Sequence, residues 1–196
     1  SVSSSWLEHA KKYVQNIIKY LNLNHEDFII EIASNDGYLL KNFKDRGFNY
    51  MGIEPSKSTA KIAQKQGIKT KIDFFTYNLA KKISLKKKAK LIIVNNVYAH
   101  IPDVHDFTKG LKVLLSDNGV ITLEFQHLLN ILKKKQFDTV YHEHYYYYSV
   151  IYLIKIFKNY GLKIWKIDKI KTHGGSLRIY ACHDYSNRKI YSSVKK

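Results

Sequence analysis

The sequence predicts an α/β fold: a doubly wound, mixed sheet of seven strands, the last one antiparallel, with helices on both faces. Apolar runs such as residues 28–33 and 91–95 are typical of strands buried on both faces of a parallel sheet. Amphipathic segments alternate with these runs, which is the order of βαβ units. A short Gly-Gly connection between the last two runs requires antiparallel pairing, so the sheet is mixed at one edge.

Each element is bounded by a recognisable start or stop. Ser5 and Glu8 form a capping box that begins the first helix, which extends to about Leu21. Gly67 and Gly161 each follow an amphipathic segment, where glycine ends a helix. In chain order, the apolar runs place strands at 28–33, 50–54, 68–72, 91–95, 120–125, 162–170 and 176–182, and the amphipathic segments between them place helices at 37–46, 56–66, 103–115 and 150–160.

Length and composition indicate one domain over residues 1–196. The chain is 45% hydrophobic and 14% aromatic, which excludes a disordered or fibrous protein. No apolar run approaches the length of a membrane span, so we expect no membrane partner. A single cysteine, Cys182, forms no internal disulfide and favours a reducing, cytoplasmic location. Because the first residue is not Met, we expect a piece of a longer chain or a processed one.

The net charge of +17 raises the alternative of a nucleic-acid-binding protein. Only three of the 33 basic residues are arginines, namely Arg46, Arg178 and Arg188. A surface that reads phosphates usually recruits more arginine for its bidentate geometry. We therefore interpret the lysines as solvated surface and expect no specific nucleic-acid partner. We also expect a monomer or a weak oligomer.

Polar residues follow the strands at the edge where ligands bind in such sheets. The turn after the first strand contains a single glycine, Gly37, and two carboxylates flank it. This acidity repels a pyrophosphate but suits S-adenosylmethionine, which carries a sulfonium and an amino group. An acid after the second strand is placed to accept the ribose hydroxyls. The expected cofactor-binding residues are Glu31, Ala33, Ser34, Asn35, Asp36, Gly37, Glu54, Pro55, Asp73, Phe74, Asn95 and Asn96.

Two segments carry a high density of ionisable groups. One is residues 95–102, which contains His100, and the other is residues 136–148, which contains Tyr141, His142, Glu143 and His144. Burial beside aromatic rings brings such groups toward acid–base catalysis near neutral pH. His142 and His144 are also spaced as metal ligands, but no third ligand has a recognised spacing, so we expect no metal site. The run of tyrosines at 145–148 is best explained by packing.

Six stretches resemble the S-adenosylmethionine domain of the sugar C-methyltransferases, which methylate carbon 3 of nucleotide-linked 4-keto-deoxysugars. The resemblance implies a Rossmann-like class I methyltransferase fold from near the first residue to about Tyr180. The matching stretches are Ser-Ser-Trp-Leu-Glu-His-Ala from Ser4, Glu-Ile-Ala-Ser-Asn-Asp-Gly from Glu31, Gly-Ile-Glu-Pro-Ser from Gly52, Asn-Asn-Val-Tyr-Ala-His-Ile-Pro from Asn95, Phe-Asp-Thr-Val-Tyr-His-Glu-His from Phe137 and His-Gly-Gly-Ser-Leu-Arg from His173.

The resemblance also implies residue roles. Tyr141 and His144 are then the candidate bases that remove the proton beside the ketone, Glu143 supports or orients them, and His100 lies near the substrate ketone. S-adenosylhomocysteine is the expected product, and a nucleotide sugar is the expected substrate partner. Ala33 stands where many relatives have glycine. Relatives also carry an upstream Cys-rich zinc module, a carboxyl-terminal domain that holds the sugar nucleotide, and an active-site tyrosine before Ser1, all of which we expect to lie outside this chain.

The function this implies is methyl transfer from S-adenosylmethionine to carbon 3 of the sugar through an enolate. A base such as His144 or Tyr141 forms the enolate, and a donor such as His100 stabilises its oxygen. Two alternatives stay open at this point. One is a small-molecule methyltransferase with an oxygen or nitrogen acceptor, and the other is a non-catalytic binding module.

Overall fold

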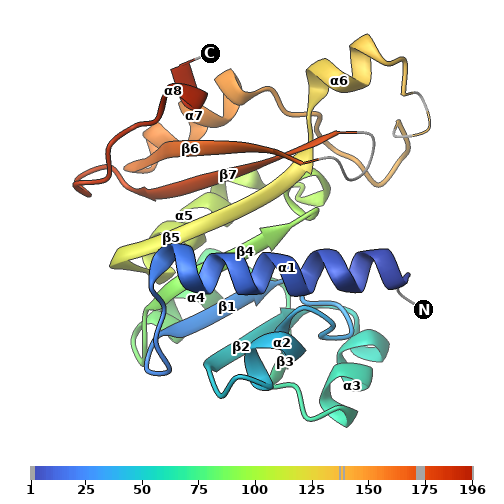
Figure 1. Ribbon diagram of the computed structural model, residues 1–196, viewed down its shortest axis with the longest axis vertical. Helices are drawn as coiled ribbons and strands as arrows, with labels where there is room; N and C mark the ends of the chain where they lie inside the picture. Colours follow the sequence, from blue (N-terminus) through green and yellow to red (C-terminus); the bar gives the residue numbers. More distant parts are fainter. Residues whose placement is uncertain (1–2, 137, 139, 171–174, 196) are drawn as a thin grey trace.

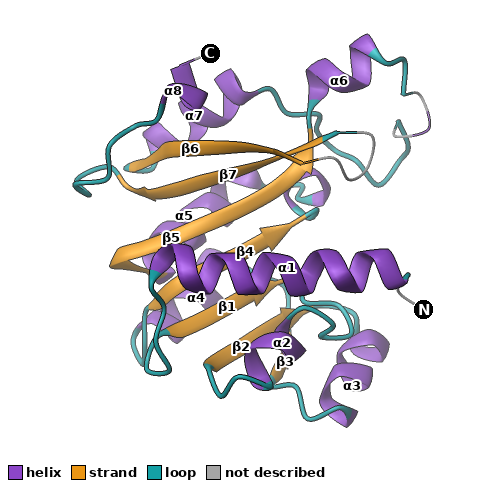
Figure 2. Cartoon of the chain, in the orientation of Figure 1, coloured by secondary structure: helices purple, strands orange, loops and turns teal. Residues whose placement is uncertain are grey.

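The computed structural model describes residues 3–136, 138, 140–170 and 175–195, which form a seven-stranded sheet covered by helices on both faces (Figures 1 and 2). The strand order is β3-β2-β1-β4-β5-β7-β6. The strands are β1 (Phe28–Ile32), β2 (Asn49–Glu54), β3 (Thr70–Ile72), β4 (Ala89–Asn95), β5 (Leu115–Gln126), β6 (Leu162–Ile170) and β7 (Ser176–His183). The helices are α1 (Ser4–Leu21), α2 (Leu40–Lys44), α3 (Lys57–Lys65), α4 (Tyr77–Ser84), α5 (Val104–Leu114), α6 (Leu128–Lys133), α7 (Val150–Asn159) and α8 (Ser192–Lys195), with a 3₁₀ turn, η1, at Tyr98–His100.

The predicted fold class is confirmed. Strands β1 to β5 pair in parallel, whereas β7 is antiparallel to both β5 and β6. Two clusters of buried apolar side chains lie on opposite faces of the sheet. Helices α4, α5 and α7 contribute to one cluster, and α1, α2 and α3 contribute to the other. The central strands β1 and β4 are therefore covered on both sides, as their continuous apolar runs predict, whereas the short edge strand β3 is largely exposed.

Some predicted boundaries were wrong. Ser3, not Ser5, caps α1, because its hydroxyl accepts from Trp6 N at 3.4 Å. The predicted helix at 37–46 is reduced to the five residues of α2. Strand β5 begins at Leu115, which pairs with Ala89 before the register shifts to Leu91 and Val120. Residues 116–119, between the predicted helix at 103–115 and the predicted strand at 120–125, therefore lie inside an irregular strand start. The predicted turn residues His173 and Gly174 lie outside the described residues.

Helix α1 crosses the sheet with its first turn at the carboxyl ends of the parallel strands (Figure 1). Its buried side chains include Tyr13, whose hydroxyl lies 2.6 Å from Thr122 Oγ1 of β5. The start of α1 therefore lies at the edge of the sheet where ligands bind in this class of fold. No helix in the described part of the chain combines the length and apolar character of a membrane span.

Candidate active site

The turn after β1 is held against the end of β2 by one carboxylate. Glu54 Oε2 accepts from Asn35 N at 2.9 Å, and Glu54 Oε1 accepts from Ser56 N at 2.8 Å. Ala33 and Asn35 have φ values of +55° and +53°, in the left-handed region that favours glycine. Each Glu54 oxygen keeps one further lone-pair direction, because a carboxylate oxygen accepts two hydrogen bonds. The predicted ribose acceptor is thus rigidly oriented beside the predicted turn.

A glycine of β2 allows this turn to approach so closely. A Cβ atom on Gly52 would lie 2.4 Å from Ser34 Oγ and 2.9 Å from Leu40 Cδ1. No side chain fits in that space without displacing the turn. Gly52 begins the stretch Gly-Ile-Glu-Pro-Ser, and its missing side chain is what allows the turn after β1 to pack against β2.

We refer to the region outside the carboxyl ends of β1, β2 and β4, where ligands bind in this class of fold, as the acidic crevice. Glu31 is its most unusual group. Its side chain lies at the end of β1, the residue is 3% exposed, and its Oε2 has no hydrogen-bond partner among the described residues. Burial raises the pKa of Glu31 well above its usual range, and the nearby charges of Asp36, Glu54 and Glu124 raise it further. Asn95 Oδ1 at the end of β4 is likewise buried and unpartnered. These orphaned acceptors fit a ligand that carries an ammonium or sulfonium group.

The predicted residues at the end of β3 lie beside this crevice but at the surface. Asp73 N donates to Glu54 O at 3.3 Å, which brings Asp73 beside the end of β2. Its carboxylate pairs with Lys71 at 3.6 Å, and both side chains are more than 40% exposed. Phe74 is 71% exposed, so it forms no part of the buried core. Pro55 directly follows Glu54 and is half-buried.

Within the second predicted segment, residues 140–148 lie against the loop after β4 and help to line a cavity of about 210 Å³. Tyr145 N and Tyr146 N both donate to Ala99 O, at 2.9 and 3.3 Å. Tyr148 is buried and its hydroxyl donates to Tyr98 O at 3.4 Å, as the prediction of packing requires. Tyr145 and Tyr146 are 60% and 37% exposed, so packing in the core was wrong for these two members of the run. The cavity is lined by Asn96, Ala99, His100, Phe125, Gln126, Ile131, Asp138, Tyr141, His144, Tyr146, Tyr147 and Tyr148.

Three predicted catalytic side chains meet at this cavity. Tyr141 Oη lies 3.2 Å from His144 Nε2. The rings of His100 and His144 have their centroids 4.6 Å apart. His100 Nδ1 donates to the backbone carbonyl of Glu143 at 2.9 Å. Two imidazoles and a phenol from segments about forty residues apart in sequence therefore face one space.

The hydrogen bond to Glu143 determines the tautomer of His100. Because a carbonyl only accepts, Nδ1 carries the proton, and Nε2 of the neutral ring is a proton acceptor. Burial lowers the pKa of His100, and the neighbouring His144 lowers it further, although the bond to Glu143 O opposes this. The expected donor role of His100 therefore does not suit its neutral ring. Burial and the charge of Glu143 raise the pKa of Tyr141, so its phenol is protonated at neutral pH.

Glu143 enters the site through its backbone. Its carboxylate is exposed, and no hydrogen bond to it is found within the described segments. Its carbonyl orients His100, whereas the prediction was that Glu143 supports or orients Tyr141 and His144. Gln126 and Asp138 were missed: Gln126 directly follows the buried core of β5, so the rule used for the other strand ends would have found it.

Asn96 joins the acidic crevice and the aromatic cavity. It follows Asn95 at the end of β4, has a φ of +54°, lines the cavity, and donates its N–H to Glu124 O at 2.9 Å. The two predicted halves of the site are thus neighbours. Within the described ranges, no group of three or more His, Cys, Asp or Glu residues has the arrangement of a metal site.

Comparison with known proteins gives the family. The methyltransferase domain family matches residues 6–167. The chain belongs to that family. It is a class I domain whose cofactor is S-adenosylmethionine, and the orphaned acceptors at Glu31 and Asn95 fit that cation. Among curated proteins, the C-methyltransferase NovU of Streptomyces niveus is 30% identical over 195 residues, which are 99% of this chain and 46% of that protein. The chain therefore spans about half the length of this relative.

Solved structures share the architecture of this methyltransferase domain. The PH0226 protein of Pyrococcus horikoshii superposes with a TM-score of 0.74 at 13% identity, covering 92% of each chain. A magnesium protoporphyrin IX methyltransferase of Synechocystis, solved with bound S-adenosylhomocysteine, gives a TM-score of 0.67 at 16% identity, covering 93% of this chain and 89% of that one. At such identities the likeness shows the fold alone.

Proposed function

We propose that this methyltransferase domain methylates carbon 3 of a nucleotide-linked 4-keto-deoxysugar through an enolate. The observation that carries the proposal is the meeting of His100, His144 and Tyr141 at a cavity that adjoins the acidic crevice. An oxygen or nitrogen acceptor needs less help from a base, whereas a carbon acceptor must first lose a carbon-bound proton. The likeness to a C-methyltransferase supports the same acceptor atom.

The cofactor half rests on the residues at the strand ends. Bound S-adenosylmethionine supplies an electrophilic methyl group. Glu54 accepts the ribose hydroxyls through the lone pairs that its two backbone bonds leave available. Glu31 and Asn95 receive the cationic end, because both have buried acceptors without partners. The backbone of residues 33–37 lines the same crevice, and Asp73 and Phe74 border its adenine end.

The catalytic half assigns proton transfer to the chain's own side chains. Nε2 of neutral His100, or the His144–Tyr141 pair, accepts the proton from the carbon beside the ketone. A positioned base of this kind contributes roughly 100- to 10,000-fold to the rate. When His100 is the base, the phenol of Tyr141 turns its single proton from His144 Nε2 to the enolate oxygen and stabilises it. Glu143 holds His100 in the required tautomer through its carbonyl.

The shape and charge of the site support a nucleotide sugar. The volume of the cavity, about 210 Å³, is smaller than the roughly 300–1,000 Å³ of a pocket for a drug-sized ligand, so the cavity suits one sugar ring. Beside it, a groove along α6, the end of β6 and the start of β7 is lined by His127, Lys133, Lys134 and Lys169. Burial lowers the pKa of His127, and Lys169 and Lys133 lower it further, so the groove has a positive potential. The negative charge of a diphosphate is attracted by this positive potential.

The test uses solvent hydrogen exchange together with methyl transfer. The protein is incubated in D₂O with S-adenosylhomocysteine and a thymidine-diphosphate-linked 4-keto-6-deoxyhexose, and deuterium at carbon 3 is followed by NMR against a protein-free control. We expect enzyme-dependent exchange, and one added methyl on carbon 3 when S-adenosylmethionine replaces the product. Methylation of oxygen or nitrogen without exchange would assign the alternative acceptor class. Bound cofactor with neither reaction on any ketosugar would favour a non-catalytic module.

A further inference from the structure

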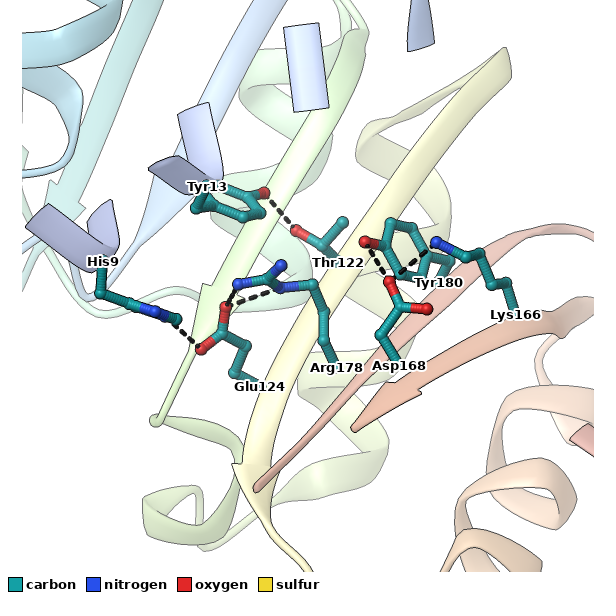
Figure 3. Close-up of polar contacts among 8 residues, drawn as sticks. All are labelled: His9, Tyr13, Thr122, Glu124, Lys166, Asp168, Arg178 and Tyr180. Atoms are coloured by element: carbon teal, nitrogen blue, oxygen red, sulfur yellow. Dashed lines mark hydrogen bonds and ion pairs between the residues drawn. The ribbon is translucent and has the colours of Figure 1, made fainter. Parts of the chain in front are cut away.

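Two stretches that the proposed function leaves without a role meet at one buried carboxylate (Figure 3). Glu124 of β5 accepts from His9 Nε2 of α1 at 3.3 Å through Oε2. Its Oε1 accepts from Arg178 Nε of β7 at 2.7 Å and also from the Arg178 Nη2 group. His9 belongs to the stretch from Ser4, and Arg178 to the stretch from His173. The chain's first helix is thereby tied to the far half of the sheet.

The contact between Glu124, His9 and Arg178 is buried and charged. Glu124 is 1% exposed, and the side chains of Arg178 and His9 are 12% and 21% exposed. The Arg178 guanidinium also lies over the Tyr13 ring, 4.5 Å from its centroid. Burial alone would raise the pKa of Glu124, but the His9 hydrogen bond and the Arg178 charge lower it overall. The carboxylate therefore stays ionised and keeps both partners in place.

The location links this contact to the cofactor crevice. Glu124 pairs with Asn95 across β4 and β5, and its carbonyl accepts from Asn96 N. One turn before His9 along α1, the Trp6 ring lies 6.5 Å from that of Tyr38, which directly follows the turn of residues 33–37. The Trp6 and His9 rings are stacked, 5.4 Å apart. The first turns of α1 thus lie over the edge that contains the predicted cofactor residues (Figure 1).

We propose that Glu124, together with His9 and Arg178, forms a positioning latch that holds the first turns of α1 over the bound cofactor. Without these contacts the first turns of α1 leave the sheet more often. Cofactor binding then has to bring them back to the sheet, which costs binding free energy. The apparent dissociation constant rises in inverse proportion to the latched fraction. The inference rests on the cofactor placement given above, but it does not depend on the acceptor atom or the sugar.

The test targets His9, because substitutions at Glu124 or Arg178 leave a buried charge unpaired. In His9→Ala the donor is lost, whereas His9→Gln keeps an amide N–H at a similar reach. The matched control is Tyr13→Phe, which removes the hydrogen bond between the same helix and the same strand one turn further along, at Thr122. The dissociation constant of S-adenosylhomocysteine is measured for each variant by titration calorimetry, with the melting temperature as the measure of stability.

We expect His9→Ala to raise the dissociation constant about 5- to 10-fold, and His9→Gln and Tyr13→Phe to change it less than about 2-fold. Tyr13→Phe should nevertheless lower the melting temperature, since it disrupts a buried hydrogen bond. Equal affinities for His9→Ala and the wild type overturn the latch. An equal loss in His9→Ala and Tyr13→Phe overturns it as well, because only helix stability then matters. A wild-type protein that binds cofactor but methylates no carbon leaves this result interpretable while rejecting the proposed acceptor.

Discussion

The phenol oxygen of Tyr141 and Nε2 of His144 lie 3.2 Å apart and form one hydrogen bond. The raised pKa of Tyr141 makes the phenol the donor at neutral pH and leaves His144 Nε2 as the acceptor. The two side chains therefore act as one unit, because the hydrogen bond between them determines where the phenol proton points and which His144 nitrogen accepts it.

This pairing predicts non-additive effects on turnover. Tyr141→Phe and His144→Ala should each lower kcat by about 100-fold or more, and the double variant should lose little beyond the worse single variant. Steady-state kinetics on the ketosugar substrate measures all three, and cofactor titration confirms that binding survives. Additive losses would mean that the two residues serve separate steps.

The lowered pKa of His100 predicts the acidic limb of the pH profile. A base works in its neutral form, so kcat/KM falls when the pH drops through the pKa of that group. Since burial lowers this pKa below the ordinary 6.5 of histidine, half-maximal kcat/KM should lie below pH 6.5. The profile of His100→Gln should lose this limb. A wild-type limb above pH 6.5, unchanged in the variant, would remove His100 as the base.

Glu31 predicts a conflict between stability and binding. Its raised pKa gives a contribution to folding that is complete below the ordinary 4.5 and is lost as the pH rises through the folded-state pKa. Glu31→Gln does not titrate, so its advantage should grow with pH and reach about 1 kcal/mol near pH 8, or roughly 2–4 °C in Tm. The same variant should bind S-adenosylmethionine more weakly. Thermal melts at pH 5 and pH 8, with cofactor titrations, measure both; a variant less stable at each pH contradicts this account.

The strands were predictable because burial on both faces leaves a continuous apolar run in the sequence. The carboxyl-end rule then located Glu31, Glu54, Asn95 and Asn96 without any contact information. Short amphipathic helices such as α4 (Tyr77–Ser84) escaped notice because eight residues hold barely two periods of the helical pattern. Leu115 is apolar in either a helix or a strand, so only its pairing with Ala89 decides between them.

The contacts of the site were less predictable than its residues. Glu124 lies inside an apolar strand, and its partner His9 is 115 positions away in sequence. Likewise, the hydrogen bond from His100 to the Glu143 carbonyl involves backbone, which carries no residue-type signal. Such long-range pairings depend on how the elements pack, and a single sequence holds no local pattern for them.

The lysine groove predicts a charge-dependent step in substrate binding. If the diphosphate occupies the groove, Lys169→Glu should raise the KM of the nucleotide sugar about 10-fold and leave kcat nearly unchanged, because uniform binding is lost. Lys82→Glu makes the same charge change at an exposed residue of α4 outside the groove and is the control. The wild-type KM should also rise with salt, and that slope should be smaller in Lys169→Glu. Equal KM values in the two lysine variants would show that only the net charge matters and that the diphosphate binds elsewhere.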